Sequence, residues 1–169
     1  KDILKVKKDY KIFDYLIYTK ISRYISLIFL HTKITPNQIT LFSLIFAIIS
    51  SIFFIKGNYT SIIFGAIFLQ LAHIFDAVDG EVARVKKMTS KWGGFFDSSV
   101  NTLTYYLVVP SMALGHYLLY DDPIVLILAM YALGNILLIS KLKYMFQSEI
   151  PNKKLGHSIH INKKLIIGG

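Results

Sequence analysis

Three aspartates and one asparagine have a spacing that would bring their side chains together on two helices. Asp76 and Asp79 are three residues apart, and Asp97 and Asn101 are four residues apart. Side chains at these offsets share one face of an α-helix. A short basic connection separates the two pairs, so we expect two adjacent antiparallel helices. The four side chains would then converge near one end of both helices.

Three carboxylates and one amide are ligands typical of a hard divalent cation. The chain has no cysteine, so thiolate ligands are excluded. Mg²⁺, Mn²⁺ and Ca²⁺ prefer oxygen ligands of this kind. We predict that Asp76, Asp79 and Asp97 are the metal ligands. Two such cations can bridge phosphate oxygens and stabilise the attacking and leaving groups of an in-line displacement.

Neighbouring residues leave room for a substrate that carries phosphate. Gly80 has no side chain, Ala83 has a small one, and Gly93 opens the start of the next helix in the same way. Arg84 has a planar guanidinium group that can donate several hydrogen bonds to a diphosphate. We predict that these four residues bind substrate.

The composition places these residues in a membrane protein. Hydrophobic residues make up 54% of the 169 residues and charged residues only 17%, against about 25% charged residues in soluble domains. Uncharged stretches long enough to cross a bilayer as helices predict four membrane spans, at about residues 36–56, 59–86, 91–119 and 123–145. The start of a fifth span is expected near residue 165. The predicted fold class is an all-α, polytopic membrane helix bundle, which excludes a soluble enzyme.

The distribution of basic residues predicts the orientation of these spans. Of the 19 Lys and Arg residues, all but Lys56 lie before the first span, between the second and third, or after the fourth. The positive-inside rule places these segments and the N-terminus in the cytoplasm. The bases therefore indicate topology, and no nucleic-acid partner is expected. We expect a multi-pass protein of the cell membrane with its active site facing the cytoplasm.

The residues before the first span are expected to lie outside the bilayer core. Residues 1–10 indicate a linker or tail, without the pattern of a signal peptide. Residues 11–33 combine bases with apolar residues at helical offsets, which predicts a juxtamembrane amphipathic helix on the cytoplasmic interface. The catalytic membrane domain is assigned to residues 34–169, and Pro36 suits the first turn of its first helix.

The segment that carries the acids resembles a known signature. It reads Asp76-Ala-Val-Asp79-Gly80-Glu-Val-Ala83-Arg84, eight residues, Gly93, three residues, Asp97, three residues, Asn101. This resembles the signature D-x-x-D-G-x-x-A-R, eight residues, G-x-x-x-D-x-x-x-D of the CDP-alcohol phosphotransferases, also called CDP-alcohol phosphatidyltransferases. Every fixed position and both gaps agree except the last, where Asn101 replaces the fourth Asp. The segment from Ile34 to Thr40 also resembles the start of the family's first membrane helix.

The resemblance implies a fold and a reaction. An acceptor alcohol, or a phosphorylated alcohol, would attack a CDP-alcohol donor, and a phosphodiester would form as CMP leaves. Two divalent cations, Mg²⁺ or Mn²⁺, would be held by the first three aspartates, and Asn37 would help to bind substrate. Family members resemble six-helix proteins, so the last two spans are expected to be missing from this sequence. Membrane lipids and a second copy of the chain are the other expected partners.

Asn101 occupies the position of the family's general base. An amide is not basic at any relevant pH, so we predict a transferase impaired at this position, with Arg84 as the other residue assigned to catalysis. One interpretation is a deliberately disabled variant, which we favour because the rest of the constellation is intact. The other is a natural paralogue that has lost or moved its base.

The substrates are less defined by the sequence. The segment from Lys20 to Leu27 resembles archaeal members that join inositol phosphates, but a lipid donor such as CDP-diacylglycerol or an archaeal CDP-diether is equally compatible. Arg23, Lys86 and Lys143 lie on the side of the metal site, where they can bind a phosphorylated acceptor or anionic headgroups.

Three alternatives to an active transferase remain open at this stage. A catalytically silent relative would bind CDP-alcohol without turning it over, and Asn101 is the residue that favours it. A divalent-cation transporter would need polar residues that continue through the bilayer. A structural membrane module would gain no thermal stability from CDP compounds with Mg²⁺.

Overall fold

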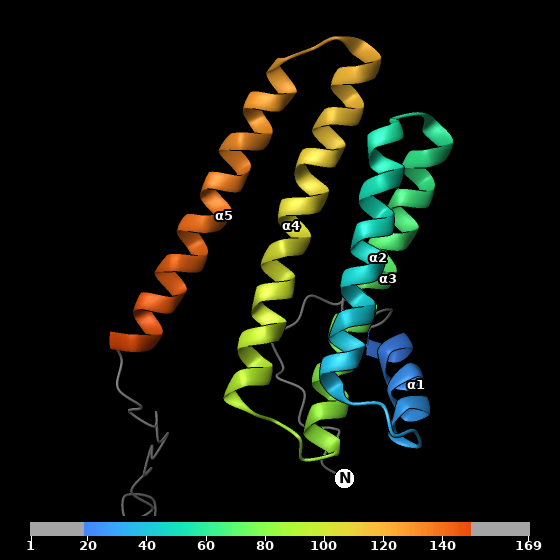
Figure 1. Ribbon diagram of the computed structural model, residues 1–169, viewed down its shortest axis with the longest axis vertical. Coiled ribbons are helices and arrows are strands. Elements are labelled where there is room, and N and C mark those ends of the chain that lie inside the picture. The colour runs from blue at the N-terminus through green and yellow to red at the C-terminus, as the bar shows by residue number, and fades with distance from the viewer. Residues whose placement is uncertain (1–18, 150–169) are drawn as a thin grey trace, which may run out of the picture. The chain divides into compact units, whose positions relative to one another are not determined.

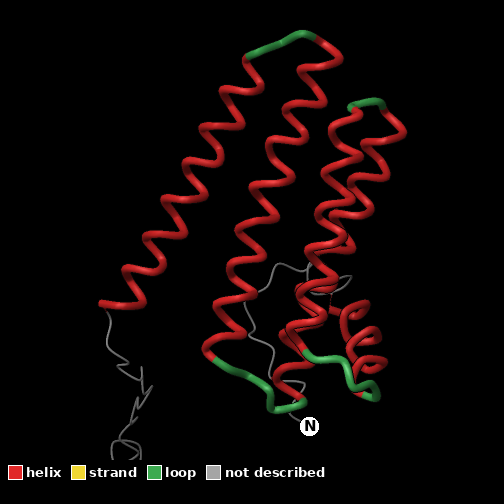
Figure 2. Tube along the Cα trace, viewed as in Figure 1, coloured by secondary structure: helices red, strands yellow, loops and turns green. Residues whose placement is uncertain are grey.

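The protein is helical throughout the part of the chain that the structure describes. The computed structural model describes residues 19–149 and contains five helices there, without strands, in line with the predicted all-α class (Figures 1 and 2). They are α1 (Thr19–Leu30), α2 (Pro36–Lys56), α3 (Tyr59–Val85), α4 (Lys91–Tyr120) and α5 (Ile124–Glu149). The predicted tail 1–10, residues 11–18 of the predicted amphipathic helix and the fifth span near residue 165 lie outside the described residues.

Three of the helices in this range are long and apolar enough to cross a membrane. By length and composition these are Pro36–Lys56, Tyr59–Val85 and Ile124–Leu142, which agree with three of the four predicted spans. The remaining predicted span, residues 91–119, is α4. Its 30 residues give a helix of about 45 Å at 1.5 Å per residue, but its first half is more polar because it carries Asp97, Asn101 and several hydroxyl side chains.

The helix α1 is shorter than the predicted amphipathic helix. It ends at Leu30 rather than at residue 33. The hydroxyl of Thr32 donates to the carbonyl of Phe29 (2.9 Å) and accepts from the amide of Ile34 (3.3 Å). These local bonds replace the next helical turn, and Pro36 then disfavours helix at the preceding residue.

The starts of the next three helices follow from their capping residues. Before α2, the amide of Thr35 donates to the side chain of Gln38 (2.9 Å). The side chain of Asn58 accepts from the amide of Ser61 at the start of α3 (2.9 Å). Ser90 accepts in the same way at the start of α4. Each bond satisfies a backbone N–H group at a helix N-terminus, where the helix itself provides no hydrogen-bond partner.

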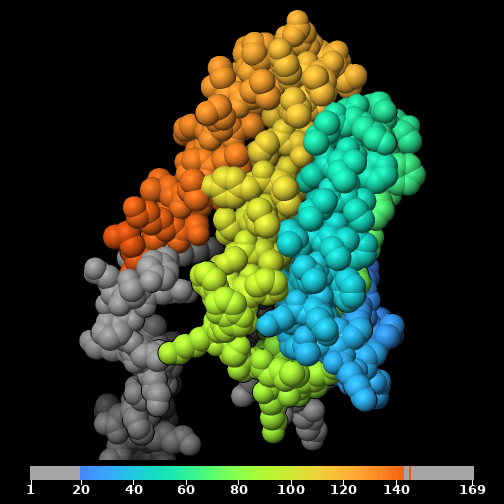
Figure 3. Space-filling model, viewed as in Figure 1, coloured from blue at the N-terminus to red at the C-terminus, as the bar shows by residue number. Residues whose placement is uncertain are grey.

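The core of the first four helices lies where α1, α2 and α3 meet. The residues Ile39, Ile74, Val78 and Val82 are 0–6% exposed, and side chains of α1 pack against this cluster. Residues 19–134 lie in one compact unit, and the contacts described here lie within it. α2 also packs against α4, and Figure 3 shows the two surfaces in contact. Because α2 packs against both α3 and α4, the C-terminal end of α3 and the start of α4 are held close together.

Small residues allow α2, α3 and α4 to approach closely at the end opposite the acids. The hydroxyl of Ser50 donates to the carbonyl of Gly65 (2.7 Å). A Cβ at Gly65 would lie 2.8 Å from the ring of Phe54, and a Cβ at Gly115 would lie 2.0 Å from the carbonyl oxygen of Phe54. These positions therefore require glycine for steric reasons.

Alanine at Gly115 should destabilise the protein, because its Cβ would collide with backbone that has to move. We expect a loss of about 1–3 kcal/mol in the free energy of unfolding, measured by denaturant unfolding in detergent. The matched control is Gly134→Ala, since a Cβ there meets nothing within 4 Å and alanine favours helix by up to about 1 kcal/mol. Equal stability of the two variants would contradict the close approach of α2 and α4.

Candidate metal and substrate site

Three carboxylates converge between α3 and α4. Asp76 and Asp79 lie on α3, and Asp97 lies on α4. One carboxylate oxygen from each residue lies within 4.8 Å of the other two. Asp79 is 5% exposed, and the other two side chains are half-buried. The structure thus brings together the three acids that the helical spacing predicted as metal ligands.

The electrostatics of this cluster fit a bound cation. In the described residues no Lys or Arg forms an ion pair with any of the three carboxylates. Oδ1 of Asp76 is buried and has no hydrogen-bond partner there. Buried polar atoms are almost always satisfied, and neighbouring like charges need compensation. The donor set of hard oxygens can hold Mg²⁺ or Mn²⁺.

Thr40 is a site residue that the sequence analysis did not assign. It is buried on α2, and its hydroxyl donates to Oδ2 of Asp79. Metal-binding side chains are commonly oriented by a hydrogen bond of this kind. The signal for Thr40 was its position three residues after Asn37, which places both on one face of α2.

Asn101 contacts one of the predicted ligands. Its Nδ2 donates to Oδ1 of Asp97 over one turn of α4 (3.0 Å). The amide therefore orients Asp97 and adds no negative charge. An aspartate at this position would instead place a fourth carboxylate at the same distance.

A pocket of about 220 Å³ opens beside the carboxylates. Seven predicted site residues line it: Asn37, Asp79, Gly80, Ala83, Arg84, Gly93 and Asp97. Asp76 and Asn101 are not among the lining residues. Asp76 belongs to the carboxylate cluster, and Asn101 contacts Asp97. Six further lining residues were not assigned from the sequence: Pro36, Thr40, Met88, Thr89, Ser90 and Gly94. They come from the start of α2, from the connection between α3 and α4, and from the start of α4.

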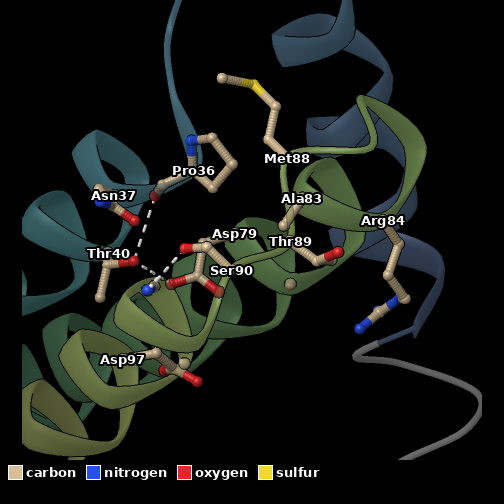
Figure 4. Close-up of a pocket in the computed structure, with 13 residues that line it drawn as sticks. Pro36, Asn37, Thr40, Asp79, Ala83, Arg84, Met88, Thr89, Ser90 and Asp97 are labelled. Atoms are coloured by element: carbon tan, nitrogen blue, oxygen red, sulfur yellow. Dashed lines mark hydrogen bonds between the residues drawn. The ribbon is translucent and has the colours of Figure 1, made fainter.

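The predicted glycines make space for polar side chains of the pocket. A Cβ at Gly80 would lie 3.2 Å from Nη1 of Arg84. A Cβ at Gly93 would lie 3.1 Å from Oγ of Ser90 and 3.5 Å from Oδ1 of Asn37. Figure 4 shows Thr40 and Arg84 at opposite sides of the pocket. The pocket therefore has hydroxyl and amide groups on one side and a guanidinium on the other.

Lys86 has a different environment from the one expected. Its ammonium group donates to the carbonyl oxygens of Thr32 (2.8 Å) and Ile34 (2.9 Å). In this position it holds the connection between α1 and α2. Arg23 is half-buried, and the side chain of Lys143 lies outside the described residues.

The fold and the site together define a class of protein: a polytopic helical membrane protein with a cluster of three carboxylates that could hold a divalent cation and a polar pocket beside it. A family model described as CDP-alcohol phosphatidyltransferase matches residues 33–166. The chain belongs to this family, which confirms the resemblance found in the signature.

Named relatives support the same assignment. The chain is 35% identical over 108 residues to a "Bifunctional IPC transferase and DIPP synthase" of Thermococcus kodakarensis, which covers 64% of this chain and 23% of the relative. It is 32% identical over 98 residues to an "Archaetidylinositol phosphate synthase" of Pyrococcus horikoshii, which covers 58% of this chain and 50% of the relative. These alignments thus span half or less of each relative's length.

Proposed function

We propose that this chain is an integral-membrane, metal-dependent transferase that moves a substituted phosphate from a CDP-alcohol to an acceptor alcohol, with release of CMP. The observation that carries the proposal is the convergence of Asp76, Asp79 and Asp97 around a buried oxygen without a partner, in a chain that belongs to this family. These residues would hold two divalent cations. When bound, the cations would neutralise the diphosphate and stabilise the displacement.

The chain's own side chains would bind and orient the donor. The guanidinium of Arg84, which lies over Gly80, is placed to donate hydrogen bonds to the diphosphate. Asn37 and Ser90 both lie beside Gly93 and would supply donors and acceptors for the cytidine portion. Thr40 holds Asp79 in its orientation. Ala83 keeps the floor of the pocket free of larger side chains.

The reaction requires a base that this chain does not have at the expected position. The acceptor oxygen forms a bond to phosphorus, the bond from phosphorus to the CMP oxygen breaks, and the acceptor proton must leave. The amide of Asn101 cannot take this proton. We therefore propose that the chain binds donor and metal but turns over slowly.

The acceptor that we propose is an inositol phosphate. The Pyrococcus horikoshii relative is named for archaetidylinositol phosphate synthesis, and the segment from Lys20 to Leu27 resembles archaeal members of that type. The donor is proposed to be either CDP-linked inositol or a CDP-lipid. Incubation with each donor separately would distinguish them by the product formed.

A silent CDP-alcohol-binding relative is the second candidate function, and the amide of Asn101 favours it. A cation transporter is less compatible with the site. Asp79 lies six residues before the end of α3, and Asp97 lies six residues after the start of α4. The acids are therefore confined to one end of the helices.

Binding can be tested separately from turnover by thermal unfolding in detergent. CDP or CMP should raise the melting temperature only when Mg²⁺ is present. A ligand at 100 times its Kd stabilises the folded state by about 2.7 kcal/mol. No stabilisation by either nucleotide, with or without Mg²⁺, would contradict the proposal and favour a structural membrane module.

We further propose that the site faces the cytoplasm and that the chain forms a homodimer in a cell membrane. Chemical cross-linking in native membranes would test the dimer.

The helix α1 is proposed to lie on the membrane interface. Its exposed face includes Tyr24 and Ile28, which are 74% and 66% exposed. This face suits contact with lipid at the interface.

The proposed orientation predicts the result of thiol labelling. A cysteine at Asn58 or Asp122 should react with an impermeant thiol reagent added outside intact cells, and a cysteine at Met88 should not. The unaltered chain has no cysteine, so it is the background control. Labelling of position 88 from outside would overturn the orientation.

A further inference from the structure

Glu81 lies within the signature segment, but its carboxylate is directed toward α1 and not toward the pocket. The hydroxyl of Ser22 donates to Oε1 of Glu81 (2.9 Å), and the hydroxyl of Ser26 donates to Oε2 (2.6 Å). Ser22 and Ser26 are four residues apart on α1 and are 1% and 6% exposed. Both carboxylate oxygens are thus engaged by buried hydroxyl groups of one helix face.

The connection of residues 31–35 joins α1 to the start of α2. It leads directly to Pro36, and then to Asn37 and Thr40 of the pocket. Lys86 binds two carbonyls of this connection. The position of α1 on α3 therefore determines where the α2 wall of the pocket begins.

The chemistry of these contacts makes them suited to fixing a position. Hydrogen bonds to a carboxylate are shorter and stronger than neutral ones. Apolar contacts such as those of Ile25 and Phe29 with the core tolerate small displacements. A half-buried carboxylate that lost both hydroxyl partners would be poorly solvated. This would favour the single arrangement in which Glu81 faces Ser22 and Ser26.

We propose that Glu81 is a positioning residue for donor binding. It holds α1 and the 31–35 connection on α3, so that Pro36 and Asn37 at the start of α2 are fixed in the pocket. This inference rests on the proposed function, because it requires the pocket to bind the nucleotide of the donor. The metal ligands lie on α3 and α4, and Thr40 has its own hydrogen bond to Asp79, so we expect this contact to affect metal affinity less than nucleotide affinity.

The test compares Glu81→Leu with Glu81→Gln in the full chain, with Mn²⁺ and CMP as the probes. Glu81→Leu should lower CMP affinity at saturating Mn²⁺ by at least about tenfold, since small displacements of positioning groups have effects of this size or larger. Its Mn²⁺ affinity should fall less than its CMP affinity. Glu81→Gln should restore CMP affinity, because its amide can accept from one serine and donate to the other hydroxyl. A role in stability alone would lower the melting temperature without this separation of the two affinities.

A second pair of variants tests the same contact independently, in case Glu81→Leu fails to fold. The double variant Ser22→Ala/Ser26→Ala should also lower CMP affinity, and Ser98→Ala/Ser99→Ala on the exposed face of α4 should not. In addition, a cysteine at Ile25 should react faster with a thiol reagent when Glu81 is leucine.

The outcomes separate this inference from the proposed function. If the unaltered chain binds Mn²⁺ and CMP, and both Glu81→Leu and the Ser22/Ser26 variant bind CMP equally well, the positioning role is wrong. An unchanged labelling rate at position 25 would also overturn it. If the unaltered chain binds neither probe, the proposed function fails, and the positioning role fails with it.

Discussion

Alanine at Asp76, Asp79 or Asp97 should each abolish the binding of Mg²⁺ or Mn²⁺ or weaken it by at least about a hundredfold. Loss of a group that merely orients a ligand already lowers metal affinity 10–100-fold. Each of these substitutions removes one of only three carboxylates in a cluster with no ion-pair partner among the described residues. Titration calorimetry with both metals measures the effect.

The stability of the metal-free protein provides an internal check on this result. The three carboxylates lie within 4.8 Å of one another, so in the absence of metal they repel each other. Asp79→Asn keeps the shape of the side chain and removes one charge. It should therefore lose metal affinity while the metal-free melting temperature stays equal or rises. Unfolding alone would lower both.

A matched control lies at the other end of α4. Asp122 accepts a hydrogen bond from the amide of Ile124 (3.0 Å), and Asp122→Asn keeps this acceptor while it removes a carboxylate far along the chain from the cluster. Its metal affinity should equal that of the unaltered chain. Unchanged affinity for both metals in all three alanine variants would show that the metal site is assigned wrongly.

Aspartate at position 101 should increase CMP release by at least about tenfold, with little change in donor affinity. A positioned base typically contributes 10²–10⁴ in rate, which corresponds to roughly 3 to 5 kcal/mol of barrier. The groups proposed to bind donor, including Arg84 and Gly80, line the pocket already. The assay follows CMP from a panel of CDP-alcohols and acceptors, inositol phosphates among them, at saturating Mg²⁺.

The geometry adds an independent expectation for the same variant. Nδ2 of Asn101 lies 3.0 Å from Oδ1 of Asp97, so Asn101→Asp would place two carboxylate oxygens in contact. The metal-free protein should be destabilised, and the affinity of the site for divalent cations should increase because a fourth carboxylate is added. Asn101→Ala also removes the contact to Asp97 but supplies no base, so it should not increase CMP release. An Asn101→Asp protein no faster than the unaltered chain, with a verified acceptor, would mean that the base lies elsewhere or that the chain is not a transferase.

Much of the candidate site follows from local regularities of the sequence. The pairs Asp76 with Asp79, and Asp97 with Asn101, share helix faces because an α-helix has 3.6 residues per turn. The connection between α3 and α4 contains only residues 86–90, so the end of α3 and the start of α4 must lie close together. Convergence of the carboxylates was therefore predictable from spacing alone. The apolar composition of α2, α3 and α5 likewise determined their lengths.

Only the tertiary structure decided which distant side chains support this cluster. Thr40 and Asp79 are 39 residues apart, and Glu81 is 59 and 55 residues from Ser22 and Ser26. The amphipathic pattern of residues 11–33 predicted a helix on the membrane interface, but it did not predict that the buried face of α1 carries hydroxyl groups that bind Glu81. Lys86 was expected to be able to bind phosphate, whereas in the structure its ammonium group donates to two backbone carbonyl oxygens. Helical periodicity says which residues share a face, but the partner of that face depends on how separate helices pack, and no local pattern contains that information.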